Sequence, residues 1–132
     1  MSKLIRKNIL GLAAIALFAA AGCGDEHADE VHLHWITMPD ATLTAGTAVP
    51  VSWSAHADGD LHHTEIRACM GEVAECGLGD MSSFDENFAA TPEGDNFTAS
   101  VSLDVAGTWT VVVYAHVDAD PHISEAAIVT VQ

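Results

Sequence analysis

The chain has 132 residues, with four Lys and Arg residues against 19 Asp and Glu residues and a formal net charge of −15. This excess of negative charge repels nucleic acid and anionic lipid head groups, so it excludes both as partners. The length suffices for one domain with a modest hydrophobic core.

The N-terminal segment has the pattern of an export signal. Lys3, Arg6 and Lys7 precede an apolar run from Ile9 to Ala21. A run of about 13 apolar residues is short for a transmembrane helix and typical of a signal peptide. We therefore expect the rest of the chain to leave the cytoplasm.

The signal ends in Ala20-Ala21-Gly22-Cys23, which resembles the lipobox of bacterial lipoproteins. The resemblance implies a cleaved signal over residues 1–22, lipidation of Cys23 and an acidic tether over residues 23–30, followed by one domain over residues 31–132. The alternatives are an ordinary secretory signal and a retained membrane anchor. Gly24 after Cys23 resembles lipoproteins sent to an outer membrane, so the predicted location is the cell envelope, with membrane contact through the lipid alone.

Cleavage would make the chain still more acidic. Arg67 is the only Lys or Arg after Cys23, and with 19 carboxylates it gives a formal charge of −18. Self-repulsion of this size costs stability unless salt or bound cations screen it. It favours a saline habitat or the binding of divalent cations.

Alternating apolar residues predict β-strands along most of the domain. Strands are expected from Val31, over residues 49–56, from Leu61 or His62 to Cys69, and over residues 97–103, 109–117 and 124–131. Turns are expected at residues 42–46, 58–60, 104–107 and 118–121, and residues 70–95 are expected to hold a disulfide loop, one weak edge strand and irregular surface. About seven short strands without helical periodicity predict an all-β, immunoglobulin-like sandwich of two antiparallel sheets. Trp35, Trp53 and Trp109 are expected in its core.

Two cysteines follow Cys23, namely Cys69 and Cys76, with six residues between them. In an oxidising compartment this spacing predicts a disulfide rather than a thiolate metal site. Closing so small a loop contributes about 2–3 kcal/mol by restricting the unfolded chain.

The run from Gly94 to Val111 has an aromatic residue and alternating apolar residues before Gly107-Thr108-Trp109. It resembles a hairpin of the YtkA-like exported domains, which in turn resemble the CopC group of periplasmic copper carriers. The resemblance implies an exported sandwich and copper chemistry through Met and His motifs. Met38, Met70 and Met81 do not form a Met-x-x-Met-type cluster, which argues against a copper(I) site.

All eight histidines follow Cys23. In an immunoglobulin-like sandwich, the N-terminus, the loop after the second strand and the loop before the last strand share one end, so the histidines are expected to gather there. The segment His32-Leu33-His34 places two imidazoles on one face of a strand, and neutral imidazole binds zinc, copper(II) or nickel. The predicted metal ligands are His32, His34, His62, His63, His116 and His122. His27 is expected to be solvated in the tether and His56 to end its strand.

Acidic pairs lie in two of the expected turns, Asp58-Gly59-Asp60 and Asp118-Ala119-Asp120. Their carboxylates are candidate further ligands or acceptors for histidine ring N–H groups. They would also suit calcium, although the usual calcium motifs are missing around them. Ordinary turn chemistry is the simplest interpretation.

The sequence has no Gly-x-Ser-x-Gly elbow, His-Glu-x-x-His helix or phosphate-binding glycine loop, so no catalytic residue and no enzyme activity are predicted. The predicted function is a lipid-anchored, extracytoplasmic sandwich that binds copper or zinc for sequestration, sensing or delivery. The alternative is a module that binds an envelope protein or a polysaccharide without metal.

Overall fold

The protein is described by a computed structural model that covers residues 30–72, 76 and 81–132. The predicted signal, Cys23 and His27 lie outside these residues. The described residues form strands, turns and loops, and they contain no helix long and apolar enough to span a membrane.

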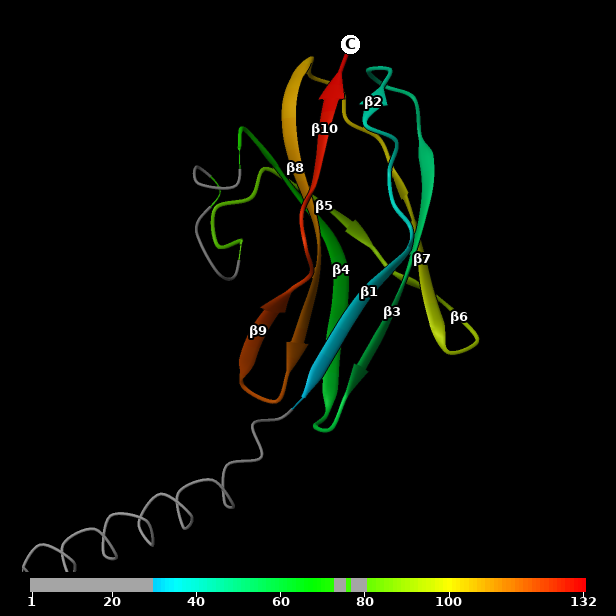
Figure 1. The fold of residues 1–132 in the computed structure, drawn as a ribbon, viewed down its shortest axis with the longest axis vertical. Helices are drawn as coiled ribbons and strands as arrows, with labels where there is room; N and C mark the ends of the chain where they lie inside the picture. The colour runs from blue at the N-terminus through cyan, green and yellow to red at the C-terminus, as the bar shows by residue number, and fades with distance from the viewer. Residues whose placement is uncertain (1–29, 73–75, 77–80) are drawn as a thin grey trace, which may run out of the picture.

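The strands form two sheets packed face to face (Figure 1). Sheet A has the order β1 (Val31–Thr37), β3 (Val49–Ala57), β7 (Asn96–Val101) and β6 (Thr91–Glu93). Sheet B has the order β2 (Thr42–Leu43), β10 (Ala127–Val131), β8 (Gly107–Val117), β4 (Leu61–Met70) and β5 (Glu86–Ala89), and β9 (Asp120–Ile123) also pairs with β8. This order is that of an immunoglobulin-like sandwich, which confirms the predicted fold class.

The number of strands differs from the prediction, because about seven were expected and the described residues form ten. β2 lies where a turn was expected and pairs in parallel with the end of β10. Residues 70–95 contain two short strands, β5 and β6, instead of one. Two- to four-residue strands carry too little alternation to be recognised in a sequence, and their partners decide that they form.

The predicted last strand, residues 124–131, forms only as β10 from Ala127, and β9 begins within the turn that was expected at residues 118–121; both strands pair with β8. Between β9 and β10, the regular backbone pairing with β8 is interrupted. There the Ser124 hydroxyl accepts a hydrogen bond from Val113 N at 2.9 Å. The Ser124 amide also donates to Val113 O at 3.0 Å. The backbone of β8 therefore stays hydrogen-bonded at Val113, in the gap between its partner strands β9 and β10.

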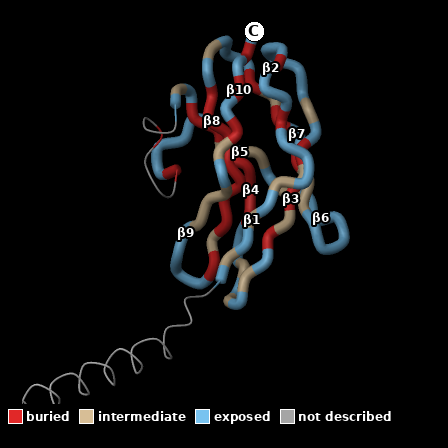
Figure 2. Tube along the Cα trace, in the orientation of Figure 1, coloured by how far each residue is buried: buried red, intermediate tan, exposed pale blue. Residues whose placement is uncertain are grey.

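The core lies between the two sheets, where burial alternates along β3 and β10 and is nearly continuous along β8 (Figure 2). Trp53 is fully buried and Trp109 nearly so, whereas Trp35 packs half-buried at the margin. The indole N–H of Trp53 donates to Thr64 Oγ1 at 3.0 Å, and the Thr64 hydroxyl donates to Tyr114 O at 2.9 Å. Satisfied hydrogen bonds of this kind allow polar atoms inside an apolar core.

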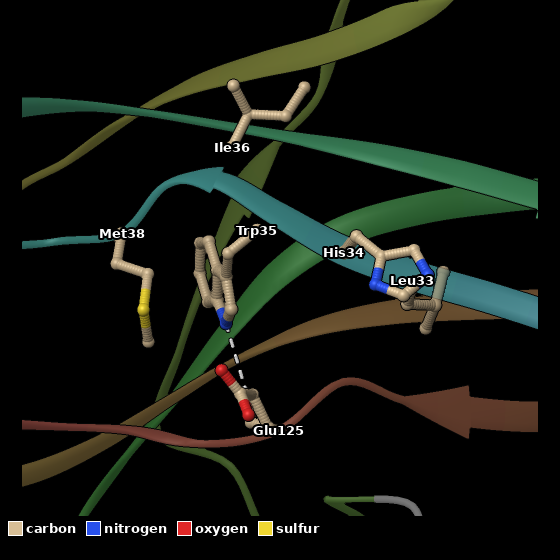
Figure 3. Close-up of a pocket in the computed structure, with 6 residues that line it drawn as sticks. All are labelled: Leu33, His34, Trp35, Ile36, Met38 and Glu125. Atoms are coloured by element: carbon tan, nitrogen blue, oxygen red, sulfur yellow. Dashed lines mark hydrogen bonds between the residues drawn. The ribbon is translucent and has the colours of Figure 1, made fainter.

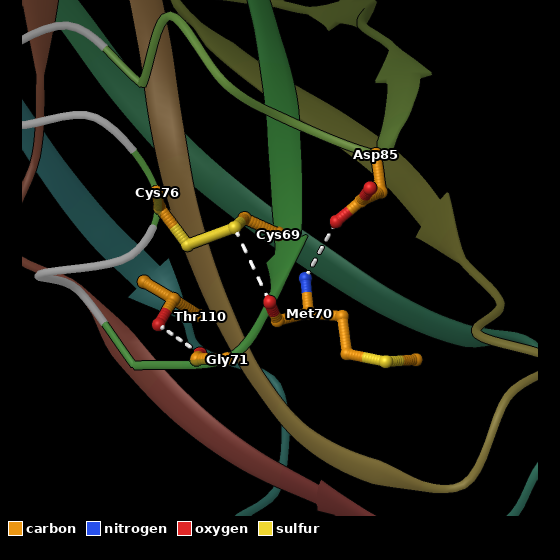
Figure 4. Close-up of a disulfide and its surroundings, with 6 residues drawn as sticks. All are labelled: Cys69, Met70, Gly71, Cys76, Asp85 and Thr110. Carbon is orange, nitrogen blue, oxygen red and sulfur yellow. Dashed lines mark hydrogen bonds between the residues drawn. A yellow bond between two sulfur atoms is a disulfide. The ribbon is translucent and has the colours of Figure 1, made fainter.

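Cys69 and Cys76 form the predicted disulfide, with their Cα atoms 5.7 Å apart (Figure 4). Cys76 and Met81 pack with Val112 in a small second apolar cluster on the outer face of sheet B. Thr110 Oγ1 donates to Gly71 O at 2.8 Å where the chain leaves β4. The disulfide therefore fixes loop residues against the outside of the sheet.

Candidate functional site

The histidine-bearing segments lie at one end of the sandwich. There β1 begins, β3 turns into β4, and β8 turns into β9, while the C-terminus lies at the opposite end (Figure 1). Backbone hydrogen bonds join the three segments, from Asp58 N to Glu30 O at 3.2 Å and from Asp118 N to Asp60 O at 2.9 Å. We call this end of the molecule the histidine end.

Three histidines lie on the outer face of sheet A. His32 is the direct cross-strand partner of His56, and His34 follows His32 on the same face of β1. The rings of His32 and His34 are stacked, with centroids 6.0 Å apart and planes 12° apart. All three residues are exposed. The sequence assigned no role to His56 beyond ending its strand, because only the register shows that it faces His32.

A second group lies on the outer face of sheet B. His63 is the cross-strand partner of His116, and a bulge in β4 places His62 between Leu61 and His63. The rings of His62 and His116 have centroids 6.1 Å apart. His63 Nε2 lies 3.4 Å from Glu65 Oε1, so this imidazole already contacts a carboxylate of the protein.

Glu65 is the centre of a polar network that the sequence analysis did not find. Its carboxylate is 5% exposed and accepts hydrogen bonds from Arg67 Nε at 3.0 Å and from Asn87 Nδ2 at 2.9 Å. The Arg67 guanidinium lies over the rings of Tyr114, at 3.4 Å, and Phe84, at 4.2 Å. Arg67 was conspicuous as the only Lys or Arg after Cys23, which was the available signal.

The environment of Glu65 changes its acidity. Burial alone would raise the pKa of this carboxyl. Hydrogen bonds from Asn87, Arg67 and His63, together with the electrostatic effect of His63, outweigh burial and hold the pKa below its usual value. The network therefore favours an ionised Glu65.

His122 lies apart from both groups. It pairs with Ala115, whose side chain points toward the core, so the register directs His122 to the face opposite His63 and His116. Across the described ranges 30–72, 76 and 81–132, no three His, Cys, Asp or Glu side chains are gathered closely enough to hold a metal ion as they stand. The structure thus brings the predicted ligands to one end but distributes them over different faces.

The acidic turns pack against each other. Asp118 Oδ1 accepts a hydrogen bond from Asp60 N at 3.2 Å, and Asp118 adopts a positive φ of 52°. A Cβ atom at Gly59 would lie 2.9 Å from Asp118 Cγ, so a larger residue there would displace the Asp118 carboxylate. These contacts are the turn chemistry that was the simplest interpretation of the two pairs.

A shallow cavity of about 460 Å³ lies beside β1, lined by Leu33, His34, Trp35, Ile36, Met38 and Glu125 (Figure 3). The indole of Trp35 points toward Glu125 and donates to its backbone oxygen at 3.1 Å. Ile36 and Met38 are both exposed at this edge of sheet A. The cavity therefore combines one imidazole and one thioether with an apolar wall.

No protein-family model and no curated protein matches the sequence. Among solved structures, the fold is similar to the crystal structure of domains 4 and 5 of the S-layer protein SbsC, with a TM-score of 0.40 and 8% sequence identity. The match covers 79% of this chain and 53% of that chain, so this chain spans about half of that structure's length. A TM-score this low supports no inference about function.

Proposed function

We propose that this protein is a lipid-anchored, extracytoplasmic β-sandwich that binds a copper(II) or zinc(II) ion through imidazoles at the histidine end. Its role would be sequestration, sensing or delivery of the ion, without catalysis. The observation that supports the proposal is the exposed pair of His32 and His34, whose nearly parallel rings lie 6.0 Å apart on one strand face. The lipobox and the resemblance to YtkA-like and CopC domains remain predictions.

The chemistry of the histidine end suits such an ion. Neutral imidazole is a good ligand for zinc and copper(II), with metal–nitrogen distances of about 2.0–2.1 Å for zinc. The formal charge of −15 attracts cations to the whole surface and raises their local concentration. The pair is therefore open to ions and surrounded by a favourable potential.

The proposed anchor would keep this end close to the membrane. Glu30, at the start of the described chain, lies beside the histidines, with its Oε1 3.7 Å from His32 Nε2. Six residues, 24–29, would lie between the lipidated Cys23 and Glu30, and the seven peptide steps can span at most about 25 Å. A partner that exchanges metal would then be small or close to the membrane.

Metal titration tests the proposal. Copper(II) and zinc(II) are titrated into the full chain in detergent at pH 7.5, and we expect a Kd tighter than about 10 μM, equivalent to about 7 kcal/mol of binding free energy. Affinity should fall below about pH 6.5, where free imidazole protonates.

The double variant His32→Ala/His34→Ala should bind the ion more weakly, while His122→Ala serves as the control because His122 points to another face. Absence of binding by the wild-type chain, or unchanged binding by the double variant, would reject the proposed function.

One observation favours the alternative, a module that binds an envelope protein or polysaccharide without metal. Strands β1, β3 and β7 contain no Asp, Glu, Lys or Arg. In a strongly acidic protein, such a face suits a neutral partner. Binding to isolated envelope polysaccharide that persists in the presence of EDTA would support this second function.

A further inference from the structure

The cross-strand register on sheet A places a third imidazole beside the His32 and His34 pair. We propose that His32, His34 and His56 together form a single three-imidazole metal centre on the outer face of sheet A. This inference rests on the proposed function and adds to it the ligand set, the face of the molecule and the preferred ion. It includes His56, which the sequence predicted only to end a strand, and excludes the histidines of sheet B.

The backbone geometry supports this set. Directly opposed residues of an antiparallel pair have Cβ atoms about 4.5–5.5 Å apart, and this relation holds for His32 and His56. Residues two apart on one strand lie about 6–7 Å apart on the same face, and this relation holds for His32 and His34. His32 is therefore the corner of a small triangle of imidazoles that all project from one surface.

The side chains must turn toward a common point to bind an ion. In a tetrahedral zinc site with bonds of about 2.05 Å, ligand nitrogens are about 3.3 Å apart, which is closer than the present arrangement of the rings. The rings of His34 and His56 have no hydrogen-bond partner among the described residues, and exposed side chains change rotamer in picoseconds to nanoseconds. The strand backbone fixes the positions, and the ion would select the rotamers.

The sheet B histidines are less suited to the same task. His63 is held beside the buried carboxylate of Glu65, which also binds Arg67 and Asn87. Moving His63 to a metal would remove one of the contacts to Glu65. His116 is half-buried, which limits its access to an ion.

Three exposed imidazoles would leave at least one coordination position for water. Copper(II) exceeds zinc(II) in affinity for a given nitrogen site, so copper(II) is the ion we expect to bind more tightly. Glu30 lies 3.7 Å from His32 Nε2 and can accept a ring N–H, which would orient that imidazole. An ion held on an open face with a free position can exchange with a partner.

Copper(II) binding to the full chain in detergent tests the ligand set. Affinity is measured by titration, and pulsed electron paramagnetic resonance counts the bound imidazoles. We expect three imidazoles in the wild-type chain and two in His56→Ala, with affinity at least about tenfold lower, which corresponds to 1.4 kcal/mol. The matched controls His62→Ala and His63→Ala should leave both the count and the affinity unchanged. Zinc(II), titrated in parallel, should bind more weakly than copper(II).

The outcomes separate this inference from the proposed function. If the wild-type chain binds copper(II) and His56→Ala matches it in affinity and imidazole count, the three-imidazole centre is wrong while the proposed function stands. Loss of binding in His62→Ala or His63→Ala would also contradict the three-imidazole centre, and the proposed function then stands only if the double variant His32→Ala/His34→Ala binds more weakly as well. If the wild-type chain binds neither ion, the proposed function is wrong, and the three-imidazole centre is wrong with it. Urea unfolding without metal checks that each variant folds, and His56→Gln replaces His56→Ala if the latter does not.

Discussion

At the scale of single residues, Glu65 is the one Asp, Glu, Lys or Arg residue that is buried among the described residues. It is almost fully buried on the outer face of sheet B and holds Arg67, Asn87 and His63. Tyr114 and Phe84 enclose the guanidinium of Arg67 and reduce its contact with water. The ion pair is therefore stabilised by its surroundings as well as by charge.

Replacing Glu65 with Gln keeps the side-chain volume and removes the charge that faces Arg67. We expect Glu65→Gln to lower the free energy of unfolding by about 2 kcal/mol, because hydrogen bonds to charged groups contribute about 1.5–3 kcal/mol. Urea unfolding at pH 7.5 measures the change. Glu86→Gln on the neighbouring strand is the control, since Glu86 is exposed and should change stability by less than about 0.5 kcal/mol. Equal stabilities of wild type and Glu65→Gln would contradict this account.

The lowered pKa of Glu65 predicts how the difference in unfolding free energy between wild type and Glu65→Gln depends on pH. A carboxyl whose pKa is lower in the folded state contributes stability that is fully present above its usual pKa of 4.5. That contribution is lost as the pH falls through the folded-state pKa. The difference in unfolding free energy between wild type and Glu65→Gln should therefore shrink as the pH falls from about 5 to 3. Unfolding titrations at several pH values in this range test it, and a constant difference would be inconsistent with an ionised Glu65.

At the scale of elements, the disulfide loop stabilises sheet B from outside the main core. Cys69, Cys76 and Met81 cover Val112, whose side chain faces away from sheet A. Met70 N donates to Asp85 Oδ2 at 2.8 Å and joins the end of β4 to the chain that leads into β5 (Figure 4). The loop therefore has both a covalent and a noncovalent connection to the sheet.

The double variant Cys69→Ser/Cys76→Ser should lower the free energy of unfolding by about 2–3 kcal/mol, because the short cross-link restricts the unfolded chain. Denaturant unfolding measures the loss. Reducing the wild-type protein with a thiol is the matched control and should produce a similar loss. If reduction leaves the unfolding midpoint unchanged, the disulfide does not stabilise this fold.

The longer strands could be predicted from the sequence, and the shorter ones could not. Residues 49–57 show a clear period of two, because β3 contributes one face to the core. Residues 107–117 include a continuous apolar run, because both faces of β8 are buried. Leu43 in β2 has no such context, and its burial depends on pairing with Val131 from the far end of the chain. Whether a short edge strand forms therefore depends on a partner strand that is distant in the sequence.

At the scale of the whole molecule, repulsion between like charges opposes folding. The chain carries 19 carboxylates and a formal charge of −15, and Arg67 is the only Lys or Arg among the residues that the structure describes. Many of the carboxylates lie in turns and at strand ends, where water can solvate them. Their mutual repulsion still acts across the surface of a small domain.

Salt should therefore stabilise the fold. We expect the Tm to rise between about 0.01 M and 1 M NaCl, because the Debye length falls from about 30 Å to 3 Å. Thermal unfolding followed by circular dichroism measures the change. A variant with Glu86, Glu93 and Asp95 neutralised to Gln or Asn should depend less on salt, because it has less repulsion to screen. A Tm that falls or stays constant with added salt would contradict the role assigned to charge.

The sequence by itself determined the all-β sandwich, the disulfide and the gathering of histidine segments at one end. Alternation, cysteine spacing and strand order are local or topological properties, so they can be read along the chain. Only the tertiary structure decided that His56 faces His32, that His122 points away from His116, and that Glu65 is buried beside Arg67. These relations depend on the register between strands, and a shift of one residue would reverse the face of every side chain.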